Sequence, residues 1–285
     1  MIVVSSIAEV KDAIAKARDE RARVGFVPTM GALHDGHMSL VDCARRQADV
    51  VVMSIFVNPL QFGAGEDLSR YPRPVEEDER RAKDAGVDVV FRPTAGEMYS
   101  RDRSVGLTAG ELGSDWEGKS RPGHFDGVLT VVAKLFNIVQ PDVAVFGRKD
   151  LQQASLVKAL VRDLNIPVSI VIAPVVREED GLAMSSRNRY LSADERQQAT
   201  ILNRSLSEVR VQFAGGVRDT AALEAAGLRV MASEPRVQTD YFAVVEPATF
   251  KRHERAAPRF AAIVAARLGS TRLIDNMTVG PDDQD

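Results

Sequence analysis

The segment that decides the fold runs from Phe26 to His37 and reads FVPTMGALHDGH. Apolar residues from Val24 to Val27 predict a short buried strand, which we expect Pro28 and Gly31 to end. A helix is predicted to follow, from Met38 to Ala48. A strand that leads into a helix places backbone N–H groups and the positive end of the helix dipole beside the connecting turn. The segment is therefore a candidate binding site for an anionic ligand.

His34 and His37 are the two residues of this segment with the clearest chemical role. They are three positions apart, so one helical turn would place both rings on the same side, where they can donate hydrogen bonds to a polyphosphate. Gly31 and Gly36 remove side chains where a ligand would approach the backbone. Taken alone, the pair is also compatible with a metal site or with two surface histidines, and a histidine in a loop is more often a surface residue.

Strands and helices alternate along the first part of the chain. The run from Val50 to Val57 is nearly continuous and rich in β-branched residues, which is typical of a strand buried on both faces of a parallel sheet. A helix predicted from Pro74 to Ala85 and a strand from Val87 to Phe91 continue the alternation. The pattern predicts an α/β fold with a doubly wound parallel sheet in residues 1–175, and a second, smaller α+β domain in residues 176–285.

The composition is that of a globular chain with a substantial core. The 285 residues are 45% hydrophobic and 27% charged, and this length suits one large domain or two ordinary ones. The net charge of −3 argues against broad binding to nucleic acid or to an anionic membrane surface. A single cysteine excludes an internal disulfide bond. Because no run of ~18 apolar residues occurs, we expect no signal peptide, no membrane span and a cytoplasmic location.

Three clusters of polar residues follow predicted strands. In open α/β sheets, ligands bind outside the carboxyl ends of the strands, so each cluster is a candidate for the same site. The first cluster could bind a small polar substrate, the second could supply a phosphate-binding lysine, and the third could wrap a pyrophosphate with hydroxyls and a guanidinium. Each cluster alone is also compatible with ordinary surface residues. The clusters are Asn58 with Gln61, then Lys149 and Asp150 with Gln153, and lastly Met184-Ser185-Ser186-Arg187-Asn188.

Two further regions are candidates for ligand contacts. The stretch from Arg92 to Asp126 is irregular and rich in Gly, Ser and charge, and a loop of this length is usually a lid or a binding loop. It contains Arg121, a candidate substrate-binding residue. Glu77 and Asp78 belong to an acidic patch that would hold Mg²⁺ through water, although a solvated helix face explains the same pattern.

Four segments together resemble the pantothenate synthetase (pantoate–β-alanine ligase) family. The resemblance follows the order of the chain over nearly its whole length, and the combination of the four segments is specific. The HDGH element also resembles the H-x-G-H signature of class I aminoacyl-tRNA synthetases. The segments are PTMGALHDGH at residues 28–37, SIFVNPLQF at residues 54–62, GRKD at residues 147–150 with Gln152 and Gln153, and residues 177–191, which include DGLAMSSRNRYL from Asp180 to Leu191.

The resemblance implies a Rossmann-like N-terminal domain, a smaller C-terminal lid domain and a homodimer. It implies ATP and Mg²⁺ as cofactors and (R)-pantoate and β-alanine as substrates. The activity implied is a ligation that passes through a pantoyl-adenylate and forms a carbon–nitrogen bond.

The resemblance also assigns residues by position. His37 is the proton donor of the family, and His34, Lys149 and Arg187 join it as candidate catalytic residues. Gln61 and Gln153 would hold pantoate, with Gln61 also near β-alanine. Arg148 and Leu151 depart from the acidic and aromatic residues that the family often has there. The ATP site would comprise Met30, Gly31, Ala32, Leu33, His34, Asp35, Gly36, His37, Gly147, Arg148, Lys149, Asp150, Val176, Met184, Ser185, Ser186 and Arg187.

Two other functions stay open at this point. A nucleotidyltransferase of the same superfamily shares the H-x-G-H element but leaves the nucleotide on its product. A nucleotide-binding module without catalysis would also need the histidines. Free AMP that appears only when an amine is supplied would separate the ligase from both.

Overall fold

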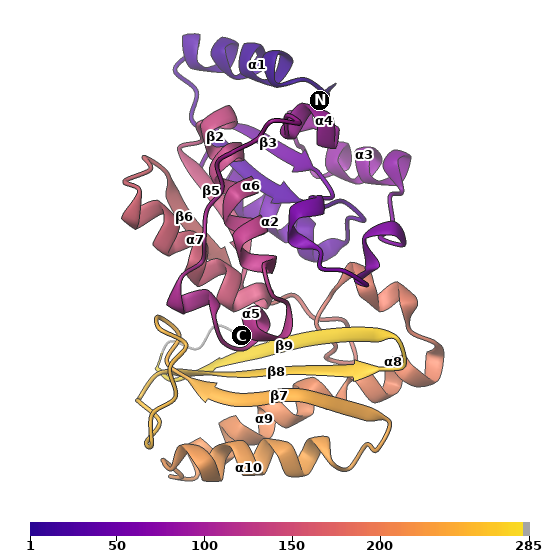
Figure 1. Ribbon diagram of the computed structural model, residues 1–285, viewed down its shortest axis with the longest axis vertical. Helices are drawn as coiled ribbons and strands as arrows, with labels where there is room; N and C mark the ends of the chain where they lie inside the picture. The colour runs from indigo at the N-terminus through magenta and orange to yellow at the C-terminus, as the bar shows by residue number, and fades with distance from the viewer. Residues whose placement is uncertain (282–285) are drawn as a thin grey trace. The chain divides into compact units, whose positions relative to one another are not determined.

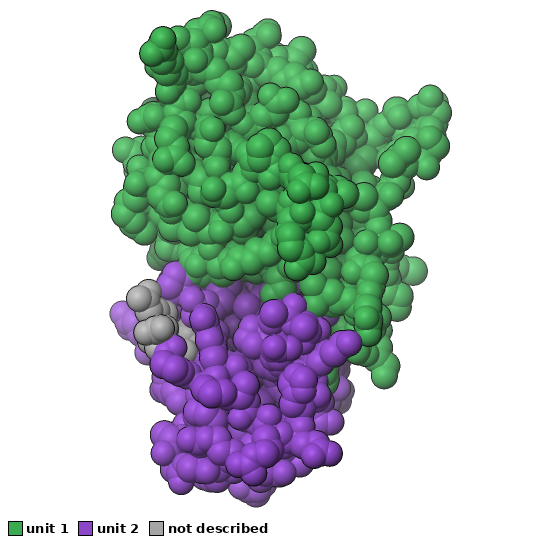
Figure 2. Space-filling model, turned by 90° about the vertical axis from the view of Figure 1, so that its left-hand side faces the viewer, with its two compact units in different colours: residues 1–147, 153–173 green, residues 148–152, 174–285 purple. Residues whose placement is uncertain are grey.

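The structure is a computed structural model that describes residues 1–281. The chain divides into two compact units, which Figure 2 colours separately. The N-terminal unit comprises residues 1–147 and 153–173, and the C-terminal unit comprises residues 148–152 and 174–285, of which 282–285 lie outside the described residues. A functional boundary between residues 175 and 176 stays a prediction.

Among the described residues, six parallel strands form the sheet of the N-terminal unit, in the order β1-β4-β3-β2-β5-β6 (Figure 1). From β2 the chain builds toward β3 and β4 on one side, and β5 and β6 continue on the other side. Ligands in such sheets bind where the direction reverses, at the carboxyl ends of the central strands. A turn at residues 30–33 follows β2 and leads into the H-x-G-H segment at residues 34–37. The strands are β1 Ile2–Val4, β2 Val24–Thr29, β3 Val50–Ile55, β4 Val89–Phe91, β5 Val143–Gly147 and β6 Ser169–Ala173.

Helices cover both faces of this sheet because successive strand residues point to opposite sides. Phe26 lies in a core with α1, α6 and α7, whereas the next residue, Val27, lies in a core with α2 and α3. The longer helices are α1 Ile7–Asp19, α2 Asp35–Arg45, α3 Val75–Asp84, α6 His124–Val139 and α7 Leu151–Asp163. The short ones are η1 Pro59–Gln61, η2 Asp67–Ser69, α4 Ala95–Met98, η3 Glu111–Gly113 and α5 Glu117–Ser120.

A three-stranded antiparallel sheet forms the core of the C-terminal unit, in the order β7-β8-β9. Helices α9 and α10 pack on it through a core that includes Leu206 and Leu223, and Figure 1 shows both helices running beside β7. The predicted fold class is therefore confirmed. The elements are η4 Arg148–Asp150, η5 Ser186–Tyr190, α8 Ala193–Ala199, α9 Ile201–Ala214, α10 Thr220–Met231, β7 Val237–Val245, β8 Phe260–Leu268 and β9 Thr271–Val279.

Several elements differ from the sequence prediction, among them β2, α2 and β1. Strand β2 continues through Pro28 to Thr29, because a proline removes only one donor from the ladder. Helix α2 begins at Asp35 and not at Met38, so its first turn includes His37. The edge strand β1 was not predicted, since three residues are too few to show a period.

No helix in residues 1–281 combines the length and the apolar character that crossing a bilayer requires.

Candidate active site

The turn after β2 has an unusual backbone. Gly31 and Ala32 both have positive φ angles, of 81° and 50°. Thr29 stabilises the start of the turn, because its Oγ1 donates to the carbonyl of Ser54 at 2.7 Å and accepts from the amide of Gly31 at 3.2 Å. Leu33 is fully buried beneath the turn. The chain thus enters α2 from a tight, buried turn.

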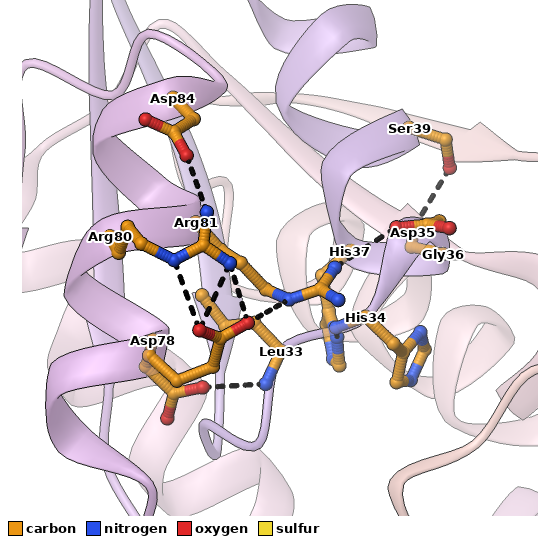
Figure 3. A network of polar contacts seen from close by, with 11 residues as sticks. Leu33, His34, Asp35, Gly36, His37, Ser39, Asp78, Arg80, Arg81 and Asp84 are labelled. Carbon is orange, nitrogen blue, oxygen red and sulfur yellow. Dashed lines mark hydrogen bonds and ion pairs between the residues drawn. The ribbon is translucent and has the colours of Figure 1, made fainter.

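Asp78 on α3 holds this turn in place (Figure 3). Its carboxylate accepts from the amide of Ala32 at 2.9 Å and from the amide of Leu33 at 2.7 Å, and the residue is only 2% exposed. A Cβ at Gly31 would lie 2.8 Å from Oδ2 of Asp78, so the carboxylate also requires a glycine there. Further along α3, Arg81 pairs with Asp35 at 3.0 Å. Helix α3 therefore binds both the turn and the start of α2.

His34 and His37 lie side by side at the N-terminus of α2, with ring centroids 4.0 Å apart. The prediction that both rings share one side of the helix is confirmed. The amide of His34 donates to Nδ1 of His37 at 3.2 Å, so a neutral His37 ring carries its proton on Nε2. The hydrogen-bond donor of a neutral His37 ring is therefore Nε2–H, which lies beside the positive end of the helix dipole.

Gln61 joins this turn from the end of β3. Its Nε2 lies 3.0 Å from Sδ of Met30, the first residue after β2. Gln61 is 7% exposed and Asn58 is 1% exposed. The predicted cluster of Asn58 and Gln61 therefore contacts the turn after β2 within the N-terminal unit, although Gln61 lies 31 positions after Met30 in the sequence.

Arg121 lies beside Gln61 but is engaged by protein groups. Its guanidinium forms a two-bonded ion pair with Glu66, at 2.6 Å and 2.9 Å, and Nη2 also donates to the carbonyl of Gln61 at 3.2 Å. The observed partners make Arg121 a support for the backbone of Gln61. Its predicted role in substrate binding stays a prediction.

His124 is a residue of this cluster that the sequence did not single out. Its Nδ1 faces the carbonyl of Gln61 at 2.8 Å, and its Nε2 faces Nη1 of Arg121 at 3.1 Å. A carbonyl only accepts and a guanidinium only donates, so the ring must be neutral with its proton on Nδ1. Burial and the neighbouring Arg121 charge lower the pKa of His124 from 6.5 to about 4, which agrees with that state.

Glu77 and Asp78 on α3 each bind other groups of the protein. Glu77 pairs with Arg80 and Arg81, each at 2.8 Å, and Asp78 accepts from the turn. Within residues 1–281, no three His, Cys, Asp or Glu side chains are grouped as for a resident metal ion. Both carboxylates thus have structural partners, and the expectation of Mg²⁺ at Glu77 and Asp78 stays a prediction.

In the C-terminal unit, the turn that carries Lys149 is held by β9. Nδ2 of Asn276 donates to the carbonyls of Arg148 and Lys149, at 3.0 Å and 2.8 Å. The neighbouring Asp275 is buried and pairs with Arg177 at 2.7 Å. Burial raises the pKa of Asp275, against the opposing effect of Arg177. Lys149 itself lies 3.7 Å from Asp150.

The serine–arginine turn has its own supports in the same unit. Ser185 caps η5, and its Oγ accepts from the amide of Arg187 at 3.3 Å. Met184 donates from its amide to the carbonyl of Val176 at 2.9 Å, so two of the predicted nucleotide contacts are neighbours. Nδ2 of Asn188 donates to Glu178 at 2.9 Å, which ties the far end of the turn to the chain before it.

The predicted site residues thus divide between the units. Those from Met30 to His37, with Asn58, Gln61, Arg121 and Gly147, belong to the N-terminal unit, and Gln153 on α7 joins them. Arg148, Lys149, Asp150, Val176 and the residues from Met184 to Arg187 belong to the C-terminal unit.

We expect the buried neutral His124 to make the N-terminal unit less stable in acid. The pKa of His124 in the folded protein lies below its unfolded value of 6.5. The contribution of His124 to the free energy of unfolding is therefore fully present above pH 6.5, and it is lost as the pH falls toward 4. Replacement by Asn keeps a donor for Gln61 without the titration. Urea unfolding can be followed by the fluorescence of the single tryptophan, Trp116. Between pH 7 and pH 5, the free energy of unfolding of the wild-type protein should fall by about 2 kcal/mol more than that of His124→Asn. Equal losses in both proteins would contradict the assignment.

Comparison with known proteins gives one consistent result. The family model described as pantoate-beta-alanine ligase matches residues 2–278. A pantothenate synthetase from Caldicellulosiruptor saccharolyticus is 48% identical over 279 residues, which cover 98% of this chain and 99% of that protein.

Solved structures agree with this match. The pantothenate synthetase of Thermus thermophilus has a TM-score of 0.94 at 47% identity, covering 99% of this chain and 100% of that one. A pantoate-beta-alanine ligase from Francisella tularensis, solved in complex with beta-gamma ATP and beta-alanine, has a TM-score of 0.80 at 33% identity, covering 97% of both chains. The chain therefore belongs to the pantoate–β-alanine ligase family, as its four sequence segments predicted.

Proposed function

We propose that the protein joins (R)-pantoate to β-alanine at the expense of ATP, and releases pantothenate, AMP and pyrophosphate. The observation that carries this proposal is the agreement with the ligase family over nearly the whole chain, at 47% identity and a TM-score of 0.94 for one solved relative. A second relative was solved with beta-gamma ATP and beta-alanine, which are the nucleotide class and the amine that the reaction needs.

In the first step, a carboxylate oxygen of pantoate attacks the α-phosphorus of ATP. The bond from the α-phosphorus to the bridging oxygen breaks, and pyrophosphate leaves with the electron pair. A carboxylic acid with a pKa of about 4 is already ionised at neutral pH, so the step needs no general base. The protein therefore contributes positioning and stabilisation of charge.

In the second step, the neutral amine of β-alanine attacks the acyl carbon of the pantoyl-adenylate. The carbon–oxygen bond to AMP breaks, the amide forms, and the nitrogen loses a proton. The amine must be neutral to attack, which favours mildly alkaline pH. The adenylate hydrolyses readily in water, so exclusion of water is part of the proposed role of the C-terminal unit and of residues 92–126.

The roles proposed for the side chains follow from their chemistry. His34 and His37, at the N-terminus of α2, donate to phosphate oxygens, and His37 is suited to this by its proton on Nε2. Lys149 and Arg187 add positive charge, and Ser185 and Ser186 bind the pyrophosphate. Gln61 and Gln153 hold pantoate, and Gln61 also lies near β-alanine.

Mg²⁺ is proposed to arrive on the phosphates of ATP. Magnesium keeps much of its water and is commonly held by substrate phosphates with one or two carboxylates, so a dedicated cage is not required. Asp150, whose side chain is 49% exposed beside Lys149, is a carboxylate that suits this role. When bound, the ion would neutralise charge on the transferring phosphate.

We further propose that the protein is a cytoplasmic homodimer that acts on small molecules only. The family resemblance supports the dimer, and the single cysteine agrees with a reducing compartment. The net charge of −3 disfavours nucleic acid as a partner.

An assay with ATP, Mg²⁺, pantoate and β-alanine tests the function directly. We expect AMP and pantothenate in equal amounts, and pyrophosphate exchange into ATP with pantoate alone. His37→Ala and Lys149→Ala should each reduce the exchange rate by roughly 10²–10³-fold, the usual loss for one charge-stabilising donor. His253→Ala and Lys158→Ala, at exposed positions, are the matched controls.

A nucleotidyl ester as the final product would instead identify a nucleotidyltransferase. Exchange rates in His37→Ala and Lys149→Ala that match those of the controls would refute the assigned roles.

Asp78→Asn should weaken nucleotide use because an amide offers one acceptor oxygen to two backbone N–H groups. We expect kcat/KM for ATP to fall by about 10- to 100-fold, since hydrogen bonds to a charged group contribute about 1.5–3 kcal/mol. Asp84→Asn, an exposed carboxylate on the same helix, should change it by less than about twofold. Equal values for Asp78→Asn and Asp84→Asn would show that the carboxylate does not position the turn.

A further inference from the structure

Asn58 lies at the carboxyl end of β3 and is almost completely buried, at 1% exposure. Its side-chain amide has four hydrogen-bond partners. Oδ1 accepts from the amide of Leu60 at 3.2 Å and from the hydroxyl of Tyr99 at 2.8 Å. Nδ2 donates to the carbonyl of Gly127 and to Oε1 of Gln61, both at 3.1 Å.

The backbone fixes which way this amide faces. The N–H of Leu60 can only donate, so it must meet Oδ1, and the carbonyl of Gly127 can only accept, so it must meet Nδ2. Helix α6 packs directly on this loop, because a Cβ at Gly127 would lie 2.2 Å from the carbonyl oxygen of Leu60. The two backbone groups are therefore held close to Asn58, and a reversed amide would break both bonds.

The fixed amide of Asn58 in turn fixes the amide of Gln61. Because Nδ2 of Asn58 is a donor, Gln61 must present Oε1 to it, and the NH₂ group of Gln61 then faces the opposite way. There Nε2 lies 3.0 Å from Sδ of Met30. A thioether sulfur is a weak acceptor. A ligand oxygen in place of the sulfur would therefore form a stronger hydrogen bond with this buried N–H group.

Tyr99 completes the arrangement from the segment after α4. Its hydroxyl must donate to Asn58, since Oδ1 is an acceptor. The Tyr99 ring lies 6.1 Å from the ring of Phe56, and the guanidinium carbon of Arg103 lies 5.8 Å from the centroid of the Tyr99 ring. Burial raises the pKa of Tyr99 to about 12, against a smaller effect of Arg103, so the hydroxyl keeps its proton throughout the neutral range.

We propose that Tyr99 and Asn58 are positioning residues that hold the amide of Gln61 in one orientation, so that Gln61 presents hydrogen-bond donors to the substrate and selects an acceptor oxygen at that place. The proposal rests on the proposed function, in which Gln61 binds pantoate. From the sequence, Gln61 was treated as a group that donates and accepts at once, whereas in the structure its oxygen already accepts from Asn58 and its NH₂ group faces the opposite way. The acceptor is then a carboxylate or hydroxyl oxygen of the hydroxy acid.

A double-mutant cycle tests this chain of contacts. Tyr99→Phe removes only the hydroxyl, and it should raise the KM for pantoate about fivefold while the KM for ATP stays within about twofold, as expected for one lost hydrogen bond. In a Gln61→Ala background the same change should have no further effect on pantoate, because Tyr99 acts through Gln61. Tyr241→Phe, in β7, is the matched control and should leave both values unchanged.

A direct readout does not need catalysis. The side-chain NH₂ signals of Gln61, assigned in a ¹⁵N spectrum by their loss in Gln61→Ala, should shift in Tyr99→Phe and stay in place in Tyr241→Phe. Unshifted signals, or an equal effect of Tyr99→Phe with and without Gln61, would overturn the proposal. A protein without ligase activity whose Gln61 signals shift as expected would overturn the proposed function alone.

Discussion

The contact between Asp78 and the backbone of the turn after β2, at Ala32 and Leu33, is the constraint on which the site depends. The turn combines two consecutive positive φ angles with burial, so its N–H groups have no helix or strand to satisfy them. The carboxylate supplies both missing acceptors at 2.7 and 2.9 Å. Because Asp78 belongs to α3, the contact links that helix to the end of β2 and to the start of α2. This link therefore sets the positions of His34 and His37.

In both units, buried polar side chains form hydrogen bonds with the backbone of irregular segments. Asn58 and His124 bind backbone groups around Gln61, and Asn276 binds two carbonyls of the turn that carries Lys149. In each case a buried polar side chain satisfies backbone atoms that irregular structure leaves without partners. Satisfying these atoms also fixes the direction of a neighbouring side chain. The residues proposed to face the ligand are thus held by other residues, which contact protein groups.

Much of the architecture could be predicted from local pattern. Apolar runs such as Val50 to Val57 predicted the parallel sheet, and the alternation of strands and helices predicted its doubly wound order. The H-x-G-H segment was correctly placed after a strand and at the start of a helix, although that helix begins within the segment, at Asp35. These features depend on spacing along the chain, which the sequence displays directly.

The supports of the site could not be predicted in this way. Asp78 was expected in a solvated or metal-binding patch, because nothing in its neighbourhood reveals a partner 46 residues earlier. His124 and Asn276 were missed for the same reason, since each contacts backbone that is remote in sequence. For Asp78 a weak signal existed, because it precedes the buried Ala82 by one helical turn and so shares the apolar side of a charged helix.

Residue-resolved hydrogen exchange measures the central contact most directly. We predict that the amides of Ala32 and Leu33 exchange slowly in the protein without ligand, although they lie in a turn, and that Asp78→Asn speeds their exchange while the amides of β2 stay protected. Rapid exchange of both amides in the wild-type protein would contradict the central role of Asp78, because the turn would then not be held before the nucleotide binds.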